Sequence, residues 1–241
     1  MAKLEELRLL LVRTRNPLNI GAVARAMQNF GARELRLVAP YEASFREARS
    51  AVGAGAVLAG AREFASVAEA VADCRLVIGT TAAGRRELQR PLLELEQAAA
   101  PVRAALEQGR VALLFGSEKH GLTREEMEHC HWLVRIATDA AQPSMNLGQA
   151  AAVCLWELAR ERDAPVVEGE VRAASGELER LGLLLMELLD AGGYVRPETA
   201  AGTEAEVRRM LRRLHVTDAD THLLMGMVRK LLWKVRSGGG Q

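Results

Sequence analysis

Three polar stretches of the chain carry side chains that can bind a ligand or stabilise charge, namely amides, a guanidinium group, a carboxylate and hydroxyls. Each stretch follows or ends a predicted strand, and the loops at strand ends are where α/β proteins hold their ligands. The stretches are NPLNIGAVARAMQN at 16–29, FGSEKHGL at 115–122 and IATDAAQPSMNL at 136–147. Together they form the candidate functional site.

The first stretch predicts a helix that begins at Ile20, with Asn19 as its cap, because Pro17 cannot continue a helix that starts before it. Arg25 lies off the predicted packing face of this helix. That face consists of Ile20, Val23, Ala24 and Met27. A capped α/β helix without a ligand is the alternative interpretation, and the position of Arg25 near the strand ends argues against it.

The second stretch places Glu118 between Gly116 and Gly121. Either glycine could turn the backbone at positive φ or let it approach a ligand. No GK[ST] follows these glycines and no GxGxxG is present, which disfavours a phosphate-binding P-loop and a conventional dinucleotide site. A glycine-rich turn alone is a weak signal, and the carboxylate between the two glycines is a better one.

The third stretch ends in Ser144 and Asn146, just before a predicted helix. Both residue types are good helix caps, so capping is the alternative explanation for each. Pro143 stiffens the loop directly before them. A polar loop of this length between a strand and a helix is also typical of ligand sites built from backbone groups.

Other catalytic and metal patterns are absent from the sequence. His129, Cys130 and His131 are adjacent, whereas zinc ligands are normally separated by two or more residues, so we expect no metal. The nucleophile motif GxSxG is also missing. The three cysteines are widely spaced without a CxxC pair, which favours a reducing cytosol.

Composition places the chain among globular proteins. Its 241 residues are 49% hydrophobic and 26% charged, with a net charge of +1. The sequence has no apolar run long enough for a membrane span and no signal-type N-terminus, so we expect a soluble, cytoplasmic protein that does not bind membranes. The low aromatic content of 4% disfavours a base-stacking platform for single-stranded nucleic acid.

Short apolar runs alternate with helical patterns over the first three-quarters of the chain. This alternation predicts an α/β fold with a parallel sheet covered on both faces. The predicted strands are 7–12, 35–38, 76–79, 111–115 and 133–136, and the predicted helices are 20–30, 67–73, 92–107 and 146–160.

The chain changes character near Glu161, where charged residues, Gly and Pro replace apolar periodicity. We expect helices at 177–191, 204–214 and 217–235, and an apolar stripe on the first. The expected organisation is a first domain at 1–162, a linker at 163–176, a small all-helical extension at 177–236 and a disordered tail at 237–241.

The helical extension carries four arginines at spacings that place them on one side of a helix. A solvated surface is the ordinary explanation, and a face that binds phosphates is the sharper one. These residues are Arg208, Arg209, Arg212 and Arg213.

Taken in order, the three stretches resemble motifs one, two and three of the SPOUT, or TrmH-type, RNA 2′-O-methyltransferases. The resemblance covers residues 7–160. The helical tail, with ELERL and RRMLRRL, and GTTA at 79–82 are similar to the TrmJ branch of that family. The resemblance implies a parallel α/β sheet with a C-terminal trefoil knot, a homodimer, and S-adenosylmethionine as the cofactor.

The resemblance also implies roles for individual residues. Arg25 would hold a phosphate and stabilise the developing alkoxide, because a guanidinium group keeps its proton and is a poor base. Asn19 would fix Arg25 and the substrate backbone, and Glu118 would orient its loop. Ser144 and Asn146 would position ribose and cofactor. The implied cofactor-binding residues are Thr80, Thr81, Ala82, Gly116, Ile136, Ser144, Met145 and Asn146.

The implied reaction is 2′-O-methylation of ribose in tRNA, at nucleotide 32, the first nucleotide of the anticodon loop. The implied RNA contacts are Arg25 and the four arginines of the extension. Three alternatives remain open. They are methylation of ribosomal RNA, an RNA-binding module that binds the cofactor without turnover, and a small-molecule enzyme with a nucleotide cofactor.

Overall fold

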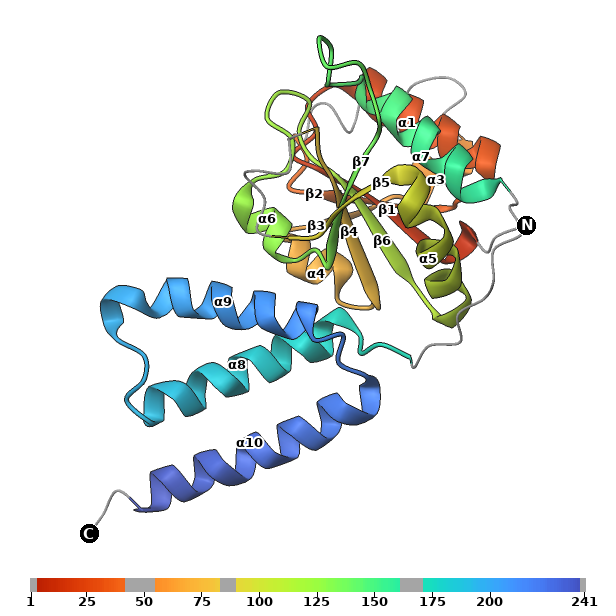
Figure 1. Cartoon of the computed structure of the whole chain (residues 1–241). Coiled ribbons are helices and arrows are strands. Elements are labelled where there is room, and N and C mark those ends of the chain that lie inside the picture. The colour runs from red at the N-terminus through yellow and green to blue at the C-terminus, as the bar shows by residue number, and fades with distance from the viewer. Residues whose placement is uncertain (1–3, 42–54, 83–89, 161–170, 239–241) are drawn as a thin grey trace. The chain divides into compact units, whose positions relative to one another are not determined.

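The computed structural model describes residues 4–41, 55–82, 90–160 and 171–238. It divides into two compact units, Met1–Glu168 and Gly169–Gln241 (Figure 1). Each unit is described below by itself. In the described residues no helix is both long enough and apolar enough to cross a membrane.

The first unit contains a sheet in which every described strand pair is parallel, as the alternating pattern predicts. A short 3-10 helix at Leu4–Glu6 precedes it. The spatial order of the strands is β3-β2-β1-β6-β4-β7-β5. Their bounds are β1 Leu7–Val12, β2 Glu34–Val38, β3 Arg62–Phe64, β4 Leu76–Thr80, β5 Leu92–Glu94, β6 Val111–Phe115 and β7 Trp132–Arg135. The strand order does not show how the chain is threaded, so the trefoil knot stays a prediction.

Helices cover both faces of this sheet (Figure 1). Apolar side chains of one sheet face form the larger core with four helices: α1 Pro17–Phe30, α3 Gly55–Ala59, α5 Leu95–Gln108 and α7 Leu147–Ala159. The opposite face packs against two five-residue helices, α4 Val67–Val71 and α6 Arg124–Glu128. Helices α1 and α7 lie side by side over the larger core.

In the first unit, the expected start of two helices is wrong. Helix α1 begins at Pro17 with Asn16 as its cap, three residues before the expected cap Asn19. The reason is that proline is favoured at the first helical position, where its missing N–H costs nothing. The expected helix at 92–107 begins only at Leu95, because its first three residues form the edge strand β5 beside β7.

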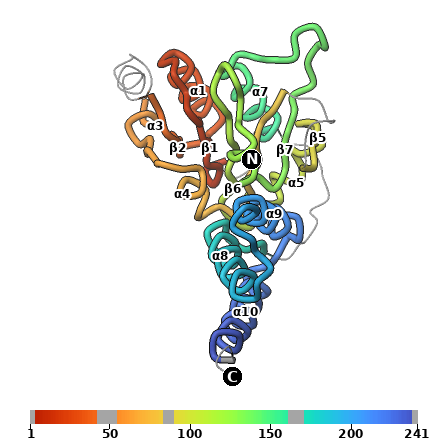
Figure 2. The backbone as a smooth tube through the Cα atoms, turned by 90° about the vertical axis from the view of Figure 1, so that its left-hand side faces the viewer, coloured from red at the N-terminus to blue at the C-terminus, as the bar shows by residue number. Residues whose placement is uncertain are grey.

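The second unit consists of three helices and a short 3-10 turn. They are α8 Ser175–Ala191, the turn Pro197–Thr199, α9 Ala200–Arg213 and α10 Asp218–Gly238. Helix α8 contacts both α9 and α10 (Figure 2). The expected apolar stripe of α8 faces these contacts, with Leu181 fully buried in the core of the unit. Helix α8 starts inside the expected linker, and α10 continues into the expected disordered tail as far as Gly238.

Candidate active site

The candidate site lies where parallel strands end at a common edge of the sheet. In the register of β4, Gly79 pairs with Leu114 of β6 and Thr80 pairs with Val134 of β7. Strand β1 is the other neighbour of β6. The segments that follow these four strands therefore start from adjacent positions. Three of them are the polar stretches singled out in the sequence, and the fourth begins at Thr81.

The carboxylate of Glu118 ties the second stretch to the first. One of its oxygens accepts hydrogen bonds from the backbone N–H of Asn16, at 3.1 Å, and from the side-chain amide of Asn19, at 3.1 Å. The other accepts from the backbone N–H of Arg15, at 3.3 Å. Burial raises the pKa of Glu118, but the bonds from Asn19, from its own backbone N–H and from those of Asn16 and Arg15 outweigh burial. The pKa therefore lies below its ordinary value.

Asn19 also ties the first stretch to the third. Its Oδ1 accepts a hydrogen bond of 3.1 Å from Nδ2 of Asn146. The Oδ1 of Asn146 accepts from the backbone N–H groups of Gly148, at 2.9 Å, and Gln149, at 3.3 Å, as the cap of α7. Backbone N–H groups only donate, so Asn146 must present its oxygen to α7 and its NH₂ group to Asn19. That orientation leaves Asn19 its own NH₂ group for Glu118.

These bonds give Asn19 a role that the sequence does not show. Its side-chain amide binds Glu118 and Asn146, so it joins the three stretches. Its expected role in fixing Arg25 and the substrate backbone stays a prediction. The sequence offers two asparagines near the start of one helix, and only the choice of Asn16 as cap frees Asn19 for this network.

Close backbone packing allows the network to form. A Cβ atom built on Gly148 would lie 2.7 Å from Cβ of Ala22, so glycine lets α7 approach α1. A Cβ atom on Gly116 would lie 2.0 Å from the carbonyl carbon of Gly121. Gly116 therefore makes room for the return of its own loop, and only Gly121, at φ +65°, uses the left-handed region.

Arg13 holds the loop of the candidate site in place, and the sequence analysis missed it. Its Nε and Nη2 donate to the two carboxylate oxygens of Glu126, at 2.6 and 3.0 Å, and Nη2 also donates to the carbonyl of Gly121, at 3.2 Å. Arg13 holds this position with φ +54°, which is uncommon for a residue other than glycine. It clamps the end of the Glu118 loop to the end of β1.

The sequence contains a local pattern that indicates the position of Glu126, one of the two residues in this ion pair. Thr123 and Glu126 form a capping box on α6, and T-x-x-E is a recognisable pattern. Burial raises the pKa of Glu126, but its hydrogen bonds with Arg13 and the backbone N–H of Thr123 outweigh burial and lower the pKa. The pairing with Arg13 spans 113 residues, which no local pattern reports.

The residues expected to hold the cofactor lie around the ends of β4, β6 and β7. The hydroxyl of Thr80 donates to the carbonyl of Leu114, at 2.9 Å, and the backbone N–H of Thr81 donates to Val134, at 3.0 Å. These bonds use the hydroxyl hydrogen of Thr80 and the backbone N–H of Thr81 to hold the loop in place. Gly116 is buried, Ile136 is half-buried, and the exposed residues are Ala82, Ser144, Met145 and Asn146. The carbonyls and the thioether can accept hydrogen bonds, and the aliphatic side chain of Ile136 can pack against a ligand.

Arg25 is exposed on α1, and it has no hydrogen bond or ion pair within the described part of the chain. The expected packing face of α1 is confirmed, since Ile20, Val23, Ala24 and Met27 are all fully buried. Arg25 shares the outer face of the helix with Leu18 and Ala22, at the spacing of successive turns. It lies six residues beyond Asn19, or about 9 Å along the helix axis.

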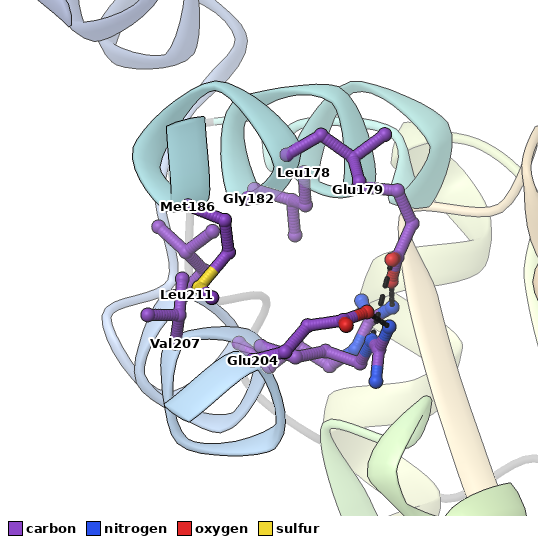
Figure 3. Close-up of a pocket in the computed structure, with 10 residues that line it drawn as sticks. Leu178, Glu179, Gly182, Met186, Glu204, Val207 and Leu211 are labelled. Carbon is purple, nitrogen blue, oxygen red and sulfur yellow. Dashed lines mark hydrogen bonds and ion pairs between the residues drawn. The ribbon is translucent and has the colours of Figure 1, made fainter. Parts of the chain in front are cut away.

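The four arginines of the helical unit do not form one solvent-facing row. Glu179 of α8 pairs with Arg212 at 2.6 Å and with Arg208 at 3.3 Å, and Arg212 is buried (Figure 3). Arg208 also pairs with Glu204, at 2.8 Å. Their neighbours Arg209, which lies 4.0 Å from Glu206, and Arg213, which is exposed, occupy the adjacent part of α9. Helical spacing alone cannot indicate that Glu179 neutralises one part of the row.

His129 and His131 are both buried in the first unit. The Nδ1 atom of His131 accepts a hydrogen bond from the backbone N–H of Val77, at 3.1 Å. Among the described residues, no three His, Cys, Asp or Glu side chains are grouped so that they could hold a metal ion.

The model of the SpoU rRNA methylase family matches residues 6–156, and the chain belongs to that family. It is therefore a methyltransferase, as the resemblance implied.

Full-length relatives narrow the branch to the TrmJ-like one. The tRNA (cytidine/uridine-2'-O-)-methyltransferase TrmJ of Klebsiella pneumoniae is 34% identical over 234 residues, which cover 93% of this chain and 96% of that protein. The TrmJ protein of Escherichia coli K12 is 33% identical over 233 residues, with 93% and 94% covered. The crystal structure of TrmJ from Zymomonas mobilis ZM4 is similar, with a TM-score of 0.80 and 33% identity over 93% of this chain and 98% of that one.

Proposed function

We propose that this protein transfers a methyl group from S-adenosylmethionine to the 2′-hydroxyl of a cytidine or uridine ribose in tRNA, at nucleotide 32. The observation that carries this proposal is the hydrogen-bonded chain of Glu118, Asn19 and Asn146, which joins the three motifs at the edge of the sheet. The choice of tRNA rests on the TrmJ relatives, whose similarity extends over the helical unit as well as the first unit.

The cofactor would lie against the ends of β4, β6 and β7. When bound, S-adenosylmethionine supplies a methyl group already activated by its sulfonium. The segments that begin at Thr80, Gly116 and Ile136 would hold its adenosine and amino-acid parts through backbone groups. Asn146 holds the start of α7 beside this site, and the exposed Ser144 and Met145 precede it.

The protein must then align a ribose hydroxyl, which is a poor nucleophile, and stabilise the charge that develops on it. Arg25 is the candidate for this role because it is exposed and has no partner in the described residues. Its guanidinium would hold a substrate phosphate and the developing alkoxide. Glu118 and Asn19 would act as positioning residues, because their polar atoms bind one another and the backbone.

A homodimer would complete the site. The small residues Ala150, Ala151 and Cys154 of α7 are the contact residues that the resemblance suggests. Ala151 and Cys154 are fully buried in the core of their own chain, so they cannot form the contact, and Ala150 is half-buried. The outer surface of α1 and α7 instead presents Leu18, which is 77% exposed, and Trp156, which is 50% exposed. Arg25 shares this surface with Leu18, so pairing there would carry Arg25 toward the site of the second subunit.

The test uses the full chain with S-adenosylmethionine and two unmodified transcripts, a tRNA and a ribosomal RNA fragment. We expect 2′-O-methylated cytidine or uridine in the tRNA alone, at nucleotide 32, by nucleoside and fragment mass spectrometry. Methylation of only the ribosomal fragment would overturn the choice of substrate. Cofactor binding without transfer to any RNA in an unfractionated, unmodified pool would overturn the enzymatic proposal. A cytoplasmic location, which the cysteine pattern favours, stays a prediction.

A further inference from the structure

Helix α10 carries two apolar stripes, each repeating at the four-and-three spacing of a coiled coil. The first stripe is Thr221, Met225, Val228 and Leu232, which are all buried, and Met225 and Val228 belong to the core of the helical unit. The second is Leu224, Met227 and Leu231, with Leu223 beside it. One stripe is sufficient to hold α10 on α8, so the second requires another explanation.

The second stripe is exposed in the described chain. Leu223, Met227 and Leu231 are 58%, 51% and 55% exposed, although they follow one another at successive turns. Scattered exposed apolar residues are ordinary, but a continuous row of large ones marks a surface that another molecule covers.

The charged residues of α10 indicate which molecule covers this stripe. Asp218 and Asp220 lie at the N-terminal end of α10, and Lys234 and Arg236 lie at its C-terminal end. Of these, Asp220 and Lys234 lie on the same side of the helix as Met227, seven residues before it and seven after it. An antiparallel copy of α10 centred on Met227 would therefore place Asp220 opposite Lys234. Asp218 and Arg236 lie on the other side of the helix, where Arg236 pairs with Glu187 of α8, at 3.1 Å.

Leu223 and Leu231 obey the same symmetry, because they are equally distant from Met227, whereas Leu224 would lie opposite Lys230. In an antiparallel pair Leu223 of one chain would contact Leu231 of the other. The two Met227 side chains would meet at the two-fold axis. A parallel pair would instead oppose acids to acids and bases to bases, which is unfavourable. The stripe is self-complementary in one orientation only.

We propose that this face of α10 is an interface with α10 of a second copy of the chain, antiparallel and centred on Met227. A helix pair of this size buries less surface than a stable dimer usually needs, so it would act together with a further contact between the same chains. The pairing does not depend on the methyl transfer proposed above, and its test below contains no enzymatic readout.

The test is disulfide formation in the full-length chain. Cys74, Cys130 and Cys154 are all buried, and burial raises the pKa of the Cys154 thiol to about 12, so background reaction is small. Met227→Cys should form a disulfide-linked dimer under mild oxidation. Arg229→Cys is the matched control, because it is exposed on the same helix but turned by about 200° from Met227. After the same oxidation, the Arg229→Cys variant should run as a monomer when it is denatured without a reductant.

Orientation is tested with Leu223→Cys and Leu231→Cys. The two positions are about 12 Å apart along one helix, beyond the reach of a disulfide. A mixture of the two variants should cross-link, and each alone should not. Lys234→Glu in the Met227→Cys background should slow cross-linking by roughly two- to tenfold at low salt, and less at high salt.

Three results would overturn the proposal. The first is cross-linking of Met227→Cys no faster than that of Arg229→Cys, which would mean that no second α10 covers this face. The second is cross-linking of Leu223→Cys with itself, which would mean a parallel pair. The third is slower cross-linking of Met227→Cys in the presence of tRNA, combined with loss of tRNA affinity in Leu231→Glu, which would assign the stripe to RNA. Circular dichroism of each variant verifies that the helices are intact.

Discussion

The side-chain amide of Asn146 donates a hydrogen bond to Oδ1 of Asn19, at 3.1 Å, across 127 residues of sequence. Since Asn19 in turn donates to Glu118, three segments far apart in the chain behave as one unit at the edge of the sheet. Each of these bonds has a fixed direction, because the backbone N–H groups at both ends of the chain of bonds can only donate. The unit can therefore be broken at a single bond.

Asn146→Asp breaks that bond and keeps the helix cap. A carboxylate still accepts from Gly148 and Gln149, but it cannot donate to Asn19. We expect the rate of methyl transfer to fall about 100-fold, as small misplacements in active sites do, with little change in the free energy of unfolding. Single-turnover rates and denaturant unfolding measure the two quantities. A nearly unchanged rate would mean that the link has no catalytic role.

Arg25→Ala should lower turnover by about 100-fold or more and leave cofactor affinity nearly unchanged, because Arg25 lies on α1 and is not among the residues expected to hold the cofactor. Calorimetric titration with S-adenosylmethionine and the methylation rate distinguish the two effects. Arg25→Lys is the control, and an activity close to that of the unchanged protein would show that a point charge is enough.

Gly148→Ala should destabilise the first unit by about 1–3 kcal/mol, because its methyl group overlaps Ala22 and forces α1 and α7 apart. Gly21→Ala is a matched control in the same helix pair. A Cβ at Gly21 meets nothing within 4 Å, so helix propensity should dominate and stability should rise by up to about 1 kcal/mol. Equal effects of the two substitutions in denaturant unfolding would contradict close packing at Gly148.

Acid should weaken the first unit through Glu118 and Glu126. Both carboxyls have a pKa below the ordinary value of about 4.3, so the unfolded chain binds their protons first as the pH falls. Their contribution to stability is complete above about pH 4.3 and is lost as the pH falls through the folded-state pKa values. Glu118→Gln should flatten the curve of unfolding free energy against pH in that range. An unchanged curve would mean that the hydrogen bonds of Glu118 do not favour its charged form.

Two arginines of α9 should behave differently. Arg212→Glu places a carboxylate against Glu179 and should destabilise the helical unit, whereas Arg213→Glu should leave its folding intact. If α9 binds tRNA, Arg213→Glu should reduce the slope of log affinity against log salt by about one. Filter binding at several salt concentrations measures the slope. An unaltered slope would remove Arg213 from the RNA interface.

Much of the first unit could be predicted because its central strands are apolar runs with clear ends. Strands β1 and β6 match the expected ranges, and both are fully buried. The edge strand β3 was missed because Arg62 and Glu63 are exposed and carry no hydrophobic pattern. The missed strand β5 resembles the start of the helix that follows it.

The residues of the candidate site could be predicted from the sequence, but the hydrogen bonds between them could not. Asn19, Glu118 and Asn146 stand out as polar residues at strand ends, but their hydrogen bonds depend on how α1 and α7 pack. The clamp of Arg13 on Glu126 was invisible for the same reason. Long-range pairs follow from the arrangement of elements, which residue spacing along the chain does not encode.

The two faces of the sheet are covered by helices of different length, and this difference should affect where the first unit opens locally. One side of the site is carried by α1 and α7, which are long and share the larger core. The other side ends at α6, a helix of five residues that is too short to persist without its contacts. Local opening of the first unit should therefore begin near α6, and amide hydrogens there should exchange with solvent before those of α7. The candidate site therefore lies between a long helix pair that should open rarely and a short helix that should open more often.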